Sequence, residues 1–451
     1  MNDVVKNENV KPLDRVSAAL DSGVMQPVRR LMNSLHSAEV ANLLESLPPT
    51  QRKVIWSLLE TSDQGDVLVE LADEVRTGII EDMDSNALVA ATEGMETDDL
   101  ADFIQDLPDT MTTQILQLMD KQDRDRVQSV LQYDEHTAGG LMNTDTITVR
   151  EDVNLQVVLR YLHQRGELPE HTDNLFVVDR NEHYQGTVSL ETIVTSSPLA
   201  TVHDVMHRGA PAFEVETSSS EVAKIFENRD LYSAAAIDDK GKLVGRITID
   251  DVVDVIREEA DKNVLSRVGL SDEDDIFSPV IPSTRRRAVW LGLNLLTAFI
   301  AAWVIGNFQG TLEKLVALAV LMPVVASMGG IAGTQTMTMV IRGMALDQIG
   351  KANFRWLLGK EILVGLLNGL IWAIVVAAVT ILWFGDNKLG LVIAIAMLAN
   401  QVIAALCGVV VPMTLRRMDI DPALAGGVVL TTITDVAGFL IFLGLATLVL
   451  I

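Results

Sequence analysis

The stretch PALAGGVVLTTITDVAGFLIFLGLATLVLI at residues 422–451 carries a single charged side chain, Asp435. It is longer than the ~20 apolar residues with which a helix crosses a bilayer. Asp435 lies 13 residues from Pro422 and 16 from Ile451. At a rise of ~1.5 Å per residue, this places it near the middle of such a helix. Because a carboxylate in hydrocarbon is costly, an acid at this depth indicates a functional residue by default.

Four further stretches carry no charge and are also long enough to span a bilayer: 288–308, 315–341, 362–384 and 389–415. The sequence therefore predicts five membrane spans. The connections between them alternate in basic residues, with nine on one side and two on the other. The nine are Arg285, Arg286, Arg287, Arg342, Lys351, Arg355, Lys360, Arg416 and Arg417, and the two are Lys314 and Lys388.

Basic residues in short connections mark the cytoplasmic side. We therefore expect a multi-pass protein of the cytoplasmic (inner) membrane, with a cytoplasmic N-terminus and the C-terminus outside. The first residues, MNDVVKNENV, are polar and do not resemble a signal peptide.

The charge of the chain is divided very unevenly. The 451 residues carry a net charge of −26. Residues 288–451 hold seven acids and eight bases, so residues 1–287 hold 54 acids and 27 bases. An acidic soluble part is unsuited to nucleic acid, whose phosphates need Lys and Arg, but it suits cations. The lone cysteine, Cys407, excludes a fold held by disulfides.

The soluble part begins with a helical section, residues 1–135. Apolar residues recur at spacings of three and four, and breaks such as Pro48-Pro49 and Pro108 follow at short intervals. A weak repeat is visible between AEVANLLESLPPT at 38–50 and TDDLADFIQDLPDT at 97–110. This pattern predicts an acidic all-α superhelical N-domain of stacked short helices, and a plain helical bundle remains the alternative.

Residues 136–256 show a different, duplicated pattern. A strand FVVD at 176–179 and a strand-to-helix segment TVSLETIV at 187–194 return 59 residues later. This α/β duplication resembles a tandem pair of CBS domains. The nucleotide signature of that module is complete in the second copy as Gly245, Thr248 and Asp251. The first copy has Thr192 in place of the acid. The resemblance leaves ATP binding at the CBS domains open.

Two of the predicted spans carry small polar faces. Gly427, Thr431 and Asp435 repeat at four and share one face of a helix. Span two contains MGGIAGTQTMT at 328–338, in which Gly329 and Gly333 permit close helix approach. The alternative for Asp435 is a protonated side chain bonded to a neighbouring helix. Asn400 and Gln401 in span four are candidates for hydrogen bonds between helices.

The membrane part offers oxygen ligands. It has no histidine, and its one thiol is Cys407. Carboxylate, hydroxyl, carbonyl and water suit hard cations, with Mg²⁺ first and then Ca²⁺ or Mn²⁺. Mg²⁺ loses its water reluctantly, so one carboxylate per chain facing its mate across a two-fold axis is sufficient to hold a hydrated ion.

The order of these parts resembles the MgtE family of magnesium channels over nearly the whole chain. The motifs that carry the resemblance are YDEHTAGGLM at 133–142, ITIDDVVDV at 247–255, GGIAGTQ at 329–335, DPAL at 421–424 and TTITDVAGF at 431–439. The resemblance implies a multidomain membrane protein. Its parts are an N-domain (1–135), a CBS pair (136–256), a plug helix and linker (250–284) and a five-helix transmembrane domain (285–451).

The resemblance also implies a homodimer in a lipid bilayer, with a pore lined by the second and fifth spans. Asp435 then holds hydrated Mg²⁺, helped by Thr431 and Thr434, and Asp421 lies at the cytoplasmic mouth. Cytosolic Mg²⁺ closes the pore by binding acids of the N and CBS domains and of the plug. By motif match these acids are Asp98, Asp102, Asp251, Asp254 and Glu259.

This chain departs from the family pattern at three places. Ile331 replaces an asparagine of the usual GGN, and Gly426-Gly427 replaces a Ser-Asn step. These two changes concern ion selectivity. Lys262 and Asn263 stand where the plug usually offers two acids, which concerns the strength of gating.

Two other functions remain open at this point. One is an exchanger or exporter of divalent cations such as Mg²⁺, Co²⁺ or Mn²⁺. The other is a membrane-bound Mg²⁺ sensor that conducts nothing. An enzyme is not expected, because the soluble part shows no nucleophile–base pair, no P-loop and no His or Cys at metal-ligand spacing.

Overall fold

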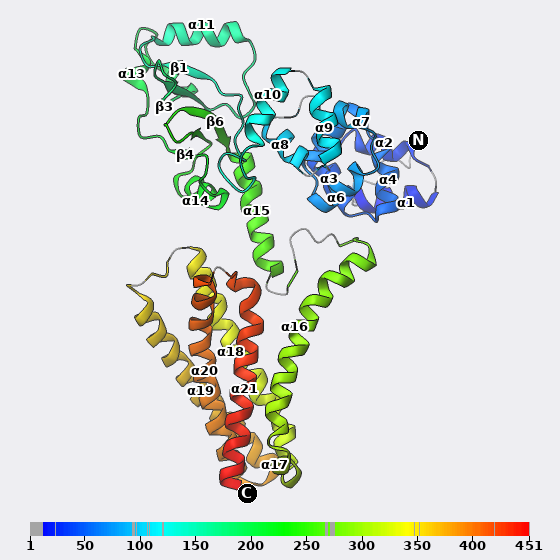
Figure 1. The fold of residues 1–451 in the computed structure, drawn as a ribbon, viewed down its shortest axis with the longest axis vertical. Coiled ribbons are helices and arrows are strands. Elements are labelled where there is room, and N and C mark those ends of the chain that lie inside the picture. Colours follow the sequence, from blue (N-terminus) through cyan, green and yellow to red (C-terminus); the bar gives the residue numbers. More distant parts are fainter. Residues whose placement is uncertain are drawn as a thin grey trace, which may run out of the picture. The chain divides into compact units, whose positions relative to one another are not determined.

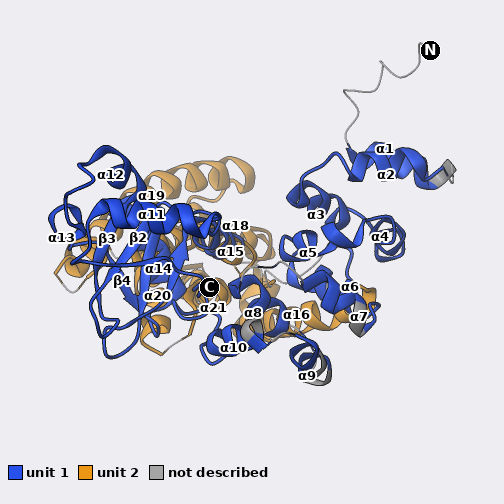
Figure 2. Ribbon diagram, turned by 90° about the horizontal axis from the view of Figure 1, so that it is seen from above, with its two compact units in different colours: residues 1–261, 273–278 blue, residues 262–272, 279–451 orange. Residues whose placement is uncertain are grey.

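The structure is a computed structural model that describes residues 12–22, 24–92, 95, 97–105, 107, 109–119, 121–266, 269–270, 276–346, 348–350, 352–418 and 420–450. It divides into two compact units, one of residues 1–261 and 273–278 and one of residues 262–272 and 279–451 (Figure 2). Part of the expected linker, residues 271–275, lies outside the described residues.

The first unit begins with short helices (Figure 1). They are α1 (Pro12–Ser22), α2 (Gln26–Met32), α3 (Ser37–Glu45), α4 (Pro49–Trp56), α5 (Thr61–Val69), α6 (Asp73–Ile80), α7 (Ser85–Thr92), α8 (Thr97–Gln105), α9 (Asp109–Leu118) and α10 (Lys121–Val130). Alternate helices pack together, α3 on α5, α5 on α7 and α7 on α9. This is the packing of a superhelical stack, in which each short helix buries its apolar face against helices nearby in sequence.

Two three-stranded sheets follow. The first is built from β1 (Thr148–Arg150), β2 (Asn174–Val178) and β3 (Tyr184–Ser189), and the second from β4 (Ala212–Glu214), β5 (Ser233–Ile237) and β6 (Leu243–Thr248). In each, the first pair of strands is parallel and the second antiparallel. The register shifts at the same place in both, between Val177 and Val178 and between Ala236 and Ile237. The predicted duplication is therefore confirmed in three dimensions.

Helices complete each copy of the duplicated unit. They are α11 (Leu155–Arg165), α12 (Leu190–Thr195), α13 (Val202–Val205), α14 (Ser219–Arg229) and α15 (Ile249–Leu265). The first copy has an apolar core of its own. The second copy shares a continuous core with the helical section, which includes Phe226 and Ile247 together with Phe103 and Ile104 of α8. Apolar burial thus fixes the second copy to the N-terminal helices.

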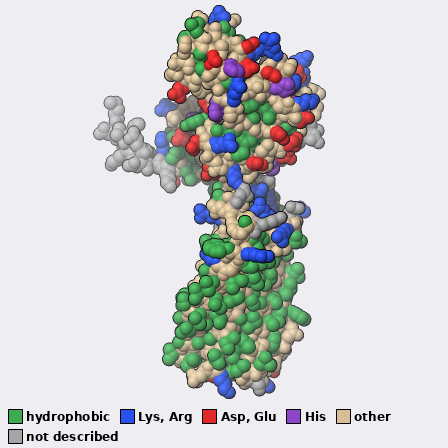
Figure 3. Space-filling model, turned by 90° about the vertical axis from the view of Figure 1, so that its left-hand side faces the viewer, with side chains coloured by type: hydrophobic (Ala, Val, Ile, Leu, Met, Phe, Trp, Pro, Cys, Tyr) green, Lys and Arg blue, Asp and Glu red, His purple; other side chains and the backbone are tan. Residues whose placement is uncertain are grey.

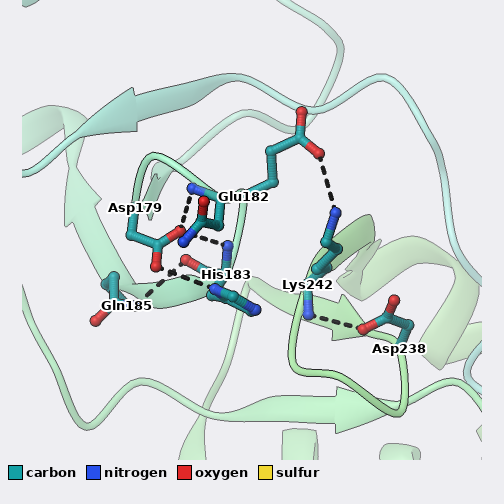
Figure 4. A network of polar contacts seen from close by, with 7 residues as sticks. Asp179, Glu182, His183, Gln185, Asp238 and Lys242 are labelled. Carbon is teal, nitrogen blue, oxygen red and sulfur yellow. Dashed lines mark hydrogen bonds and ion pairs between the residues drawn. The ribbon is translucent and has the colours of Figure 1, made fainter.

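The two copies are also joined at their hairpin turns, as Figure 4 shows. Tyr184 N donates to Gly241 O at 3.0 Å, and Leu243 N donates to Glu182 O at 3.1 Å. Lys242 Nζ lies 3.7 Å from Glu182 Oε2 across the same junction. These backbone bonds extend pairing from one sheet to the other and hold the CBS pair as one body.

The second unit contains five helices long and apolar enough to cross a membrane. They are α16 (Val280–Gly306), α18 (Ala317–Ala345), α19 (Phe354–Phe384), α20 (Asn387–Arg417) and α21 (Pro422–Leu450), and the short α17 (Gln309–Lys314) joins the first two. Figure 3 shows apolar side chains covering the visible flank of this unit, with Lys and Arg gathered toward one end. The five predicted spans are confirmed.

Helix α20 is the centre of the second unit. It packs against α18, α19 and α21, whereas α16 packs mainly on α21. Asn400 of α20 is fully buried, and its Nδ2 donates to Val325 O of α18 at 2.9 Å. Gly329 and Gly438 lie directly against this amide, where a Cβ would collide with it. The polar side chain suggested as a link between spans does join three helices, because both neighbours are glycines.

Gly329→Ala is expected to destabilise the membrane unit by about 1–3 kcal/mol, the usual cost of overpacking. The added methyl group has no room beside the buried Asn400. Thermal unfolding of the full chain in detergent measures the effect. The matched control is Gly330→Ala, since no atom lies within 4 Å of a Cβ built there. Equal melting temperatures for the two variants would contradict the packing described.

Candidate functional site

The polar face of α21 borders an open hollow beside α18. The hollow has a volume of about 500 Å³. It is lined by Ala326, Ser327, Gly330, Ile331, Thr334, Gln335, Thr431 and Asp435. Asp435 is its one acidic side chain, and no described residue forms an ion pair with it. The two polar faces expected from the sequence are thus brought together around a carboxylate that lacks a described cationic partner.

The other predicted membrane residues occupy different positions. Thr431 is exposed to the hollow and donates its hydroxyl to Gly427 O at 2.8 Å. Thr434 is fully buried, donates to Thr431 O at 3.0 Å, and does not line the hollow. Asp421 is exposed at the start of α21, where its Oδ1 accepts from Ala423 N at 2.8 Å. In this structure Thr434 supports the helix, and Asp421 caps it.

A second hollow of about 410 Å³ lies between α16, α18 and α21. It shares Thr334, Thr431 and Asp435 with the first hollow. Its remaining polar lining includes Asn294 and Thr297 of α16, which the sequence reasoning missed. The available signal was two polar residues three positions apart in an otherwise apolar span, which places them on one face of the helix.

Glu361 of α19 was also missed, because it directly precedes the uncharged stretch 362–384. Glu361 as a whole residue is 5% exposed. Thr336 of α18 donates to its Oε2 at 3.3 Å, and Lys360 Nζ lies 2.9 Å from its Oε1. Glu361 is therefore compensated by a cation and a hydroxyl and ties α19 to α18. This distinguishes it from Asp435.

Acids of the soluble unit meet where α8 approaches the second CBS copy. Asp98 is 4% exposed, and Asn143 Nδ2 lies 3.4 Å from its Oδ1. Asp251 lies in the first turn of α15, and burial together with the negative charge of Asp98 holds the pKa of Asp251 well above its ordinary range. Two acids that the sequence placed in different domains are thus brought within electrostatic range of each other.

The remaining predicted acids are more dispersed. Asp102 follows Asp98 by one helical turn and is partly buried, and Asp254 and Glu259 are exposed on α15. Partial burial and the negative charge of Asp254 raise the pKa of Glu70, an acid of the N-domain that sequence reasoning missed. Among the described residues, no three His, Cys, Asp or Glu side chains converge as a ready-made metal site.

The candidate nucleotide residues of the second CBS copy contact one another. Thr248 Oγ1 donates to Asp251 Oδ2 at 3.0 Å, and Thr248 is almost fully buried. A Cβ at Gly245 would meet the side chain of Met142. In the first copy Ser189 donates instead to Thr192 Oγ1 at 2.8 Å. Both hydroxyls therefore lie at the start of the following helix, and only the second copy adds a carboxylate.

Comparison with known proteins decides the family. The chain is 30% identical to "Magnesium transporter MgtE" of Thermus thermophilus over 437 residues, which is 96% of this chain and 97% of the relative. The chain belongs to the MgtE family. A relative of the same name from Bacillus subtilis is 27% identical and covers 96% of both chains.

Models of the parts of MgtE proteins match in the expected order. They are "MgtE intracellular N domain" at 35–136, "CBS domain" at 138–198 and 202–258, and "Divalent cation transporter" at 322–445. A similar solved structure is "Crystal structure of the cytosolic domain of the Mg2+ channel MgtE in complex with ATP". It is 28% identical to this chain, with a TM-score of 0.49, and the match covers 54% of this chain and 99% of the solved chain.

These findings confirm several expectations from the sequence. The resemblance to MgtE, the fold class and the assignment as a multi-pass membrane transporter rather than an enzyme are all confirmed. The assigned roles of individual site residues remain predictions.

Asp251→Asn is expected to stabilise the junction of α8 and α15 at neutral pH without divalent ions. An unfolded aspartate ionises near pH ~3.9. The folded carboxyl ionises at higher pH. Stability therefore falls as pH rises through that interval and stays reduced above it. Each unit of pKa elevation corresponds to about 1.4 kcal/mol, or tenfold in opening.

Hydrogen exchange of the full chain measures this effect. Amides of α8 and α15 should exchange more slowly in Asp251→Asn, and added Mg²⁺ should slow exchange more in the unsubstituted protein than in the variant. The control is Asp261→Asn, an exposed acid of the same helix. Faster exchange in Asp251→Asn at neutral pH would show that the ionised Asp251 carboxylate of the unsubstituted protein does not destabilise this junction.

Proposed function

We propose that this protein conducts Mg²⁺ across the cytoplasmic (inner) membrane and that Asp435 is the charged contact for the ion. One observation carries the proposal. Asp435 borders a hollow between two membrane helices, and none of the described residues pairs with it as a cation. An uncompensated carboxylate among apolar helices is costly, and a passing cation supplies the missing charge.

The ligands around Asp435 favour a hard, hydrated ion. The walls of the hollow offer threonine and serine hydroxyls and the amide of Gln335. Mg²⁺ prefers oxygen and keeps several of its waters. One carboxylate and neutral oxygens suit an ion that is held through its water shell. The relatives from Bacillus subtilis and Thermus thermophilus, both named "Magnesium transporter MgtE", support the same choice of ion.

The active form in this proposal is a homodimer in the bilayer, with one Asp435 from each chain at a shared pore. Two features support it. The hollow is open on one side, and α16 buries little of its surface within the chain. A second copy related by a two-fold axis presents the same surface, which is the common way that soluble and membrane subunits close such a face.

The proposed orientation places the N-terminus in the cytoplasm and the C-terminus outside. It rests on the nine basic residues of one set of connections against two of the other. The acidic N and CBS domains then sample cytosolic Mg²⁺. Bound ions relieve repulsion such as that between Asp98 and Asp251, draw the acids together and close the pore.

ATP is a further proposed ligand of the CBS domains, at Gly245, Thr248 and Asp251. The complete signature in the second copy supports it. The hydrogen bond between Thr248 and Asp251 would be exchanged for bonds to the nucleotide. Mg²⁺ is both the transported ion and the regulatory ligand in this proposal.

Asp435→Asn is expected to reduce Mg²⁺ flux by at least about tenfold, since a bond to a charged group contributes ~1.5–3 kcal/mol. Flux of the purified full chain in liposomes, read with a Mg²⁺ dye, measures it. The control is Asp386→Asn, because Asp386 caps α20 and asparagine caps equally well.

The outcomes of the flux experiment separate the possible functions. Normal flux in Asp435→Asn would exclude this residue as the ion contact. Mg²⁺ accumulation against its gradient, driven by a second ion, would indicate an exchanger or exporter. A protein that binds Mg²⁺ but passes none would indicate a sensor.

Cytosolic Mg²⁺ is expected to close the pore in inside-out patches. A shift from mostly open to mostly closed requires bound ions to favour the closed state by about 5.5 kcal/mol in total. Asp98→Asn with Asp251→Asn removes two carboxylates that bind the ion and also the repulsion between them, so closure should depend less steeply on Mg²⁺. Asp261→Asn, on the exposed face of α15, serves as the control. Currents that do not change when cytosolic Mg²⁺ is varied would rule out this gating.

A further inference from the structure

The second hollow has a polar wall supplied by α16, a helix to which neither the sequence analysis nor the comparisons assign a role. The wall includes Asn294, Thr297, Thr338, Thr431 and Thr432, and Asp435 lies at its border with the first hollow. Asn294 and Thr297 are polar exceptions within residues 288–306 of α16, where the exposed side chains are otherwise largely apolar. Membrane spans carry such polar side chains where they face a wet cavity rather than lipid.

Three hydroxyl groups of this wall already use their hydrogens. Thr297 Oγ1 donates to Asn294 O at 2.8 Å. Thr431 Oγ1 donates to Gly427 O at 2.8 Å, and Thr432 Oγ1 donates to Val428 O at 2.7 Å. A hydroxyl that donates to its own helix keeps its lone pairs for another partner. These three threonines therefore offer the hollow chiefly hydrogen-bond acceptors.

Asn294 adds to the same pattern. Its Nδ2 donates one hydrogen to Trp290 O at 3.0 Å, which leaves the carbonyl oxygen Oδ1 as an acceptor beside one remaining N–H. A lining of acceptors beside one carboxylate does not complement an anion or an acyl chain. It complements a cation whose bound waters point their hydrogens outward, because each of those hydrogens requires an acceptor.

We propose that this hollow is a second station for the hydrated cation, inside each subunit, and that Asn294 and Thr297 bind the outer face of its water shell. The inference rests on the proposed function and adds α16 to the ion's route. Thr334, Thr431 and Asp435 border both hollows, so the ion passes from one to the other without losing its charged contact.

The probe is cobalt(III) hexaammine, an inert ion that presents N–H groups outward as hydrated Mg²⁺ presents O–H groups. Asn294→Leu and Thr297→Val should each weaken its inhibition of Mg²⁺ flux by about fivefold, the value of one lost hydrogen bond. Thr297→Ser should behave like the unsubstituted protein. Full-length protein in liposomes is used throughout.

The matched control is Thr414→Val. Thr414 Oγ1 also donates to its own helix, to Val410 O at 2.8 Å, but it lines neither hollow. The same chemical change is thereby made at the same kind of hydrogen bond, away from the proposed station. Its inhibition by hexaammine should not change.

A variant that is expected to strengthen inhibition distinguishes a specific effect from misfolding. Thr297→Asp places a negative charge in the hollow and should tighten hexaammine inhibition, which a misfolded protein cannot imitate. The inference is overturned if Thr297→Asp does not tighten inhibition by hexaammine. It is also overturned if hexaammine inhibits Asn294→Leu and Thr297→Val as strongly as it inhibits the unsubstituted protein. Absence of Mg²⁺ flux in the unsubstituted protein would instead overturn the proposed function itself.

Discussion

The membrane unit is organised around the cost of placing one carboxylate among apolar helices. Glu361 avoids that cost through Lys360 and Thr336. Asp435 has no comparable partner among the described residues, and instead borders two hollows with polar walls. The two acids show both ways of keeping a charge in a membrane protein, as a compensated link between helices or as a site open to water and ions.

The hollows depend on a rigid helix behind them. Asn400 of α20 holds α18 through Val325 O, and its neighbours Gly329 and Gly438 allow α18 and α21 to approach it closely. Close packing on this side leaves the other faces of α18 and α21 for threonines and small residues. The position of Asp435 relative to Thr334 is thus set by a buried amide that lines neither hollow.

Much of this could be predicted from the sequence, and the reason is physical. Spans follow from the absence of charge over ~20 residues, and the polar face of α21 follows from the four-residue spacing of Gly427, Thr431 and Asp435. Spacing gives the face of a helix but not its neighbour. The family resemblance, not spacing, placed Thr434 beside the ion, and the structure shows this side chain buried. Asn294 was overlooked although its helix borders the same cavity. Proximity of Glu70 and Asp254 likewise depends on the tertiary fold.

The same physical problem is solved differently in the two units. In the soluble unit, burial and the negative charge of Asp98 make the ionised form of Asp251 unfavourable, and the proposed divalent ion would remove that cost. Yet no three acidic, histidine or cysteine side chains converge among the described residues to strip an ion of its water. In the proposed function, both units therefore contact the hydrated ion, through outward-pointing water hydrogens and a few acceptors. Selectivity in such a site comes from the size and geometry of the water shell, which differ between Mg²⁺ and larger cations.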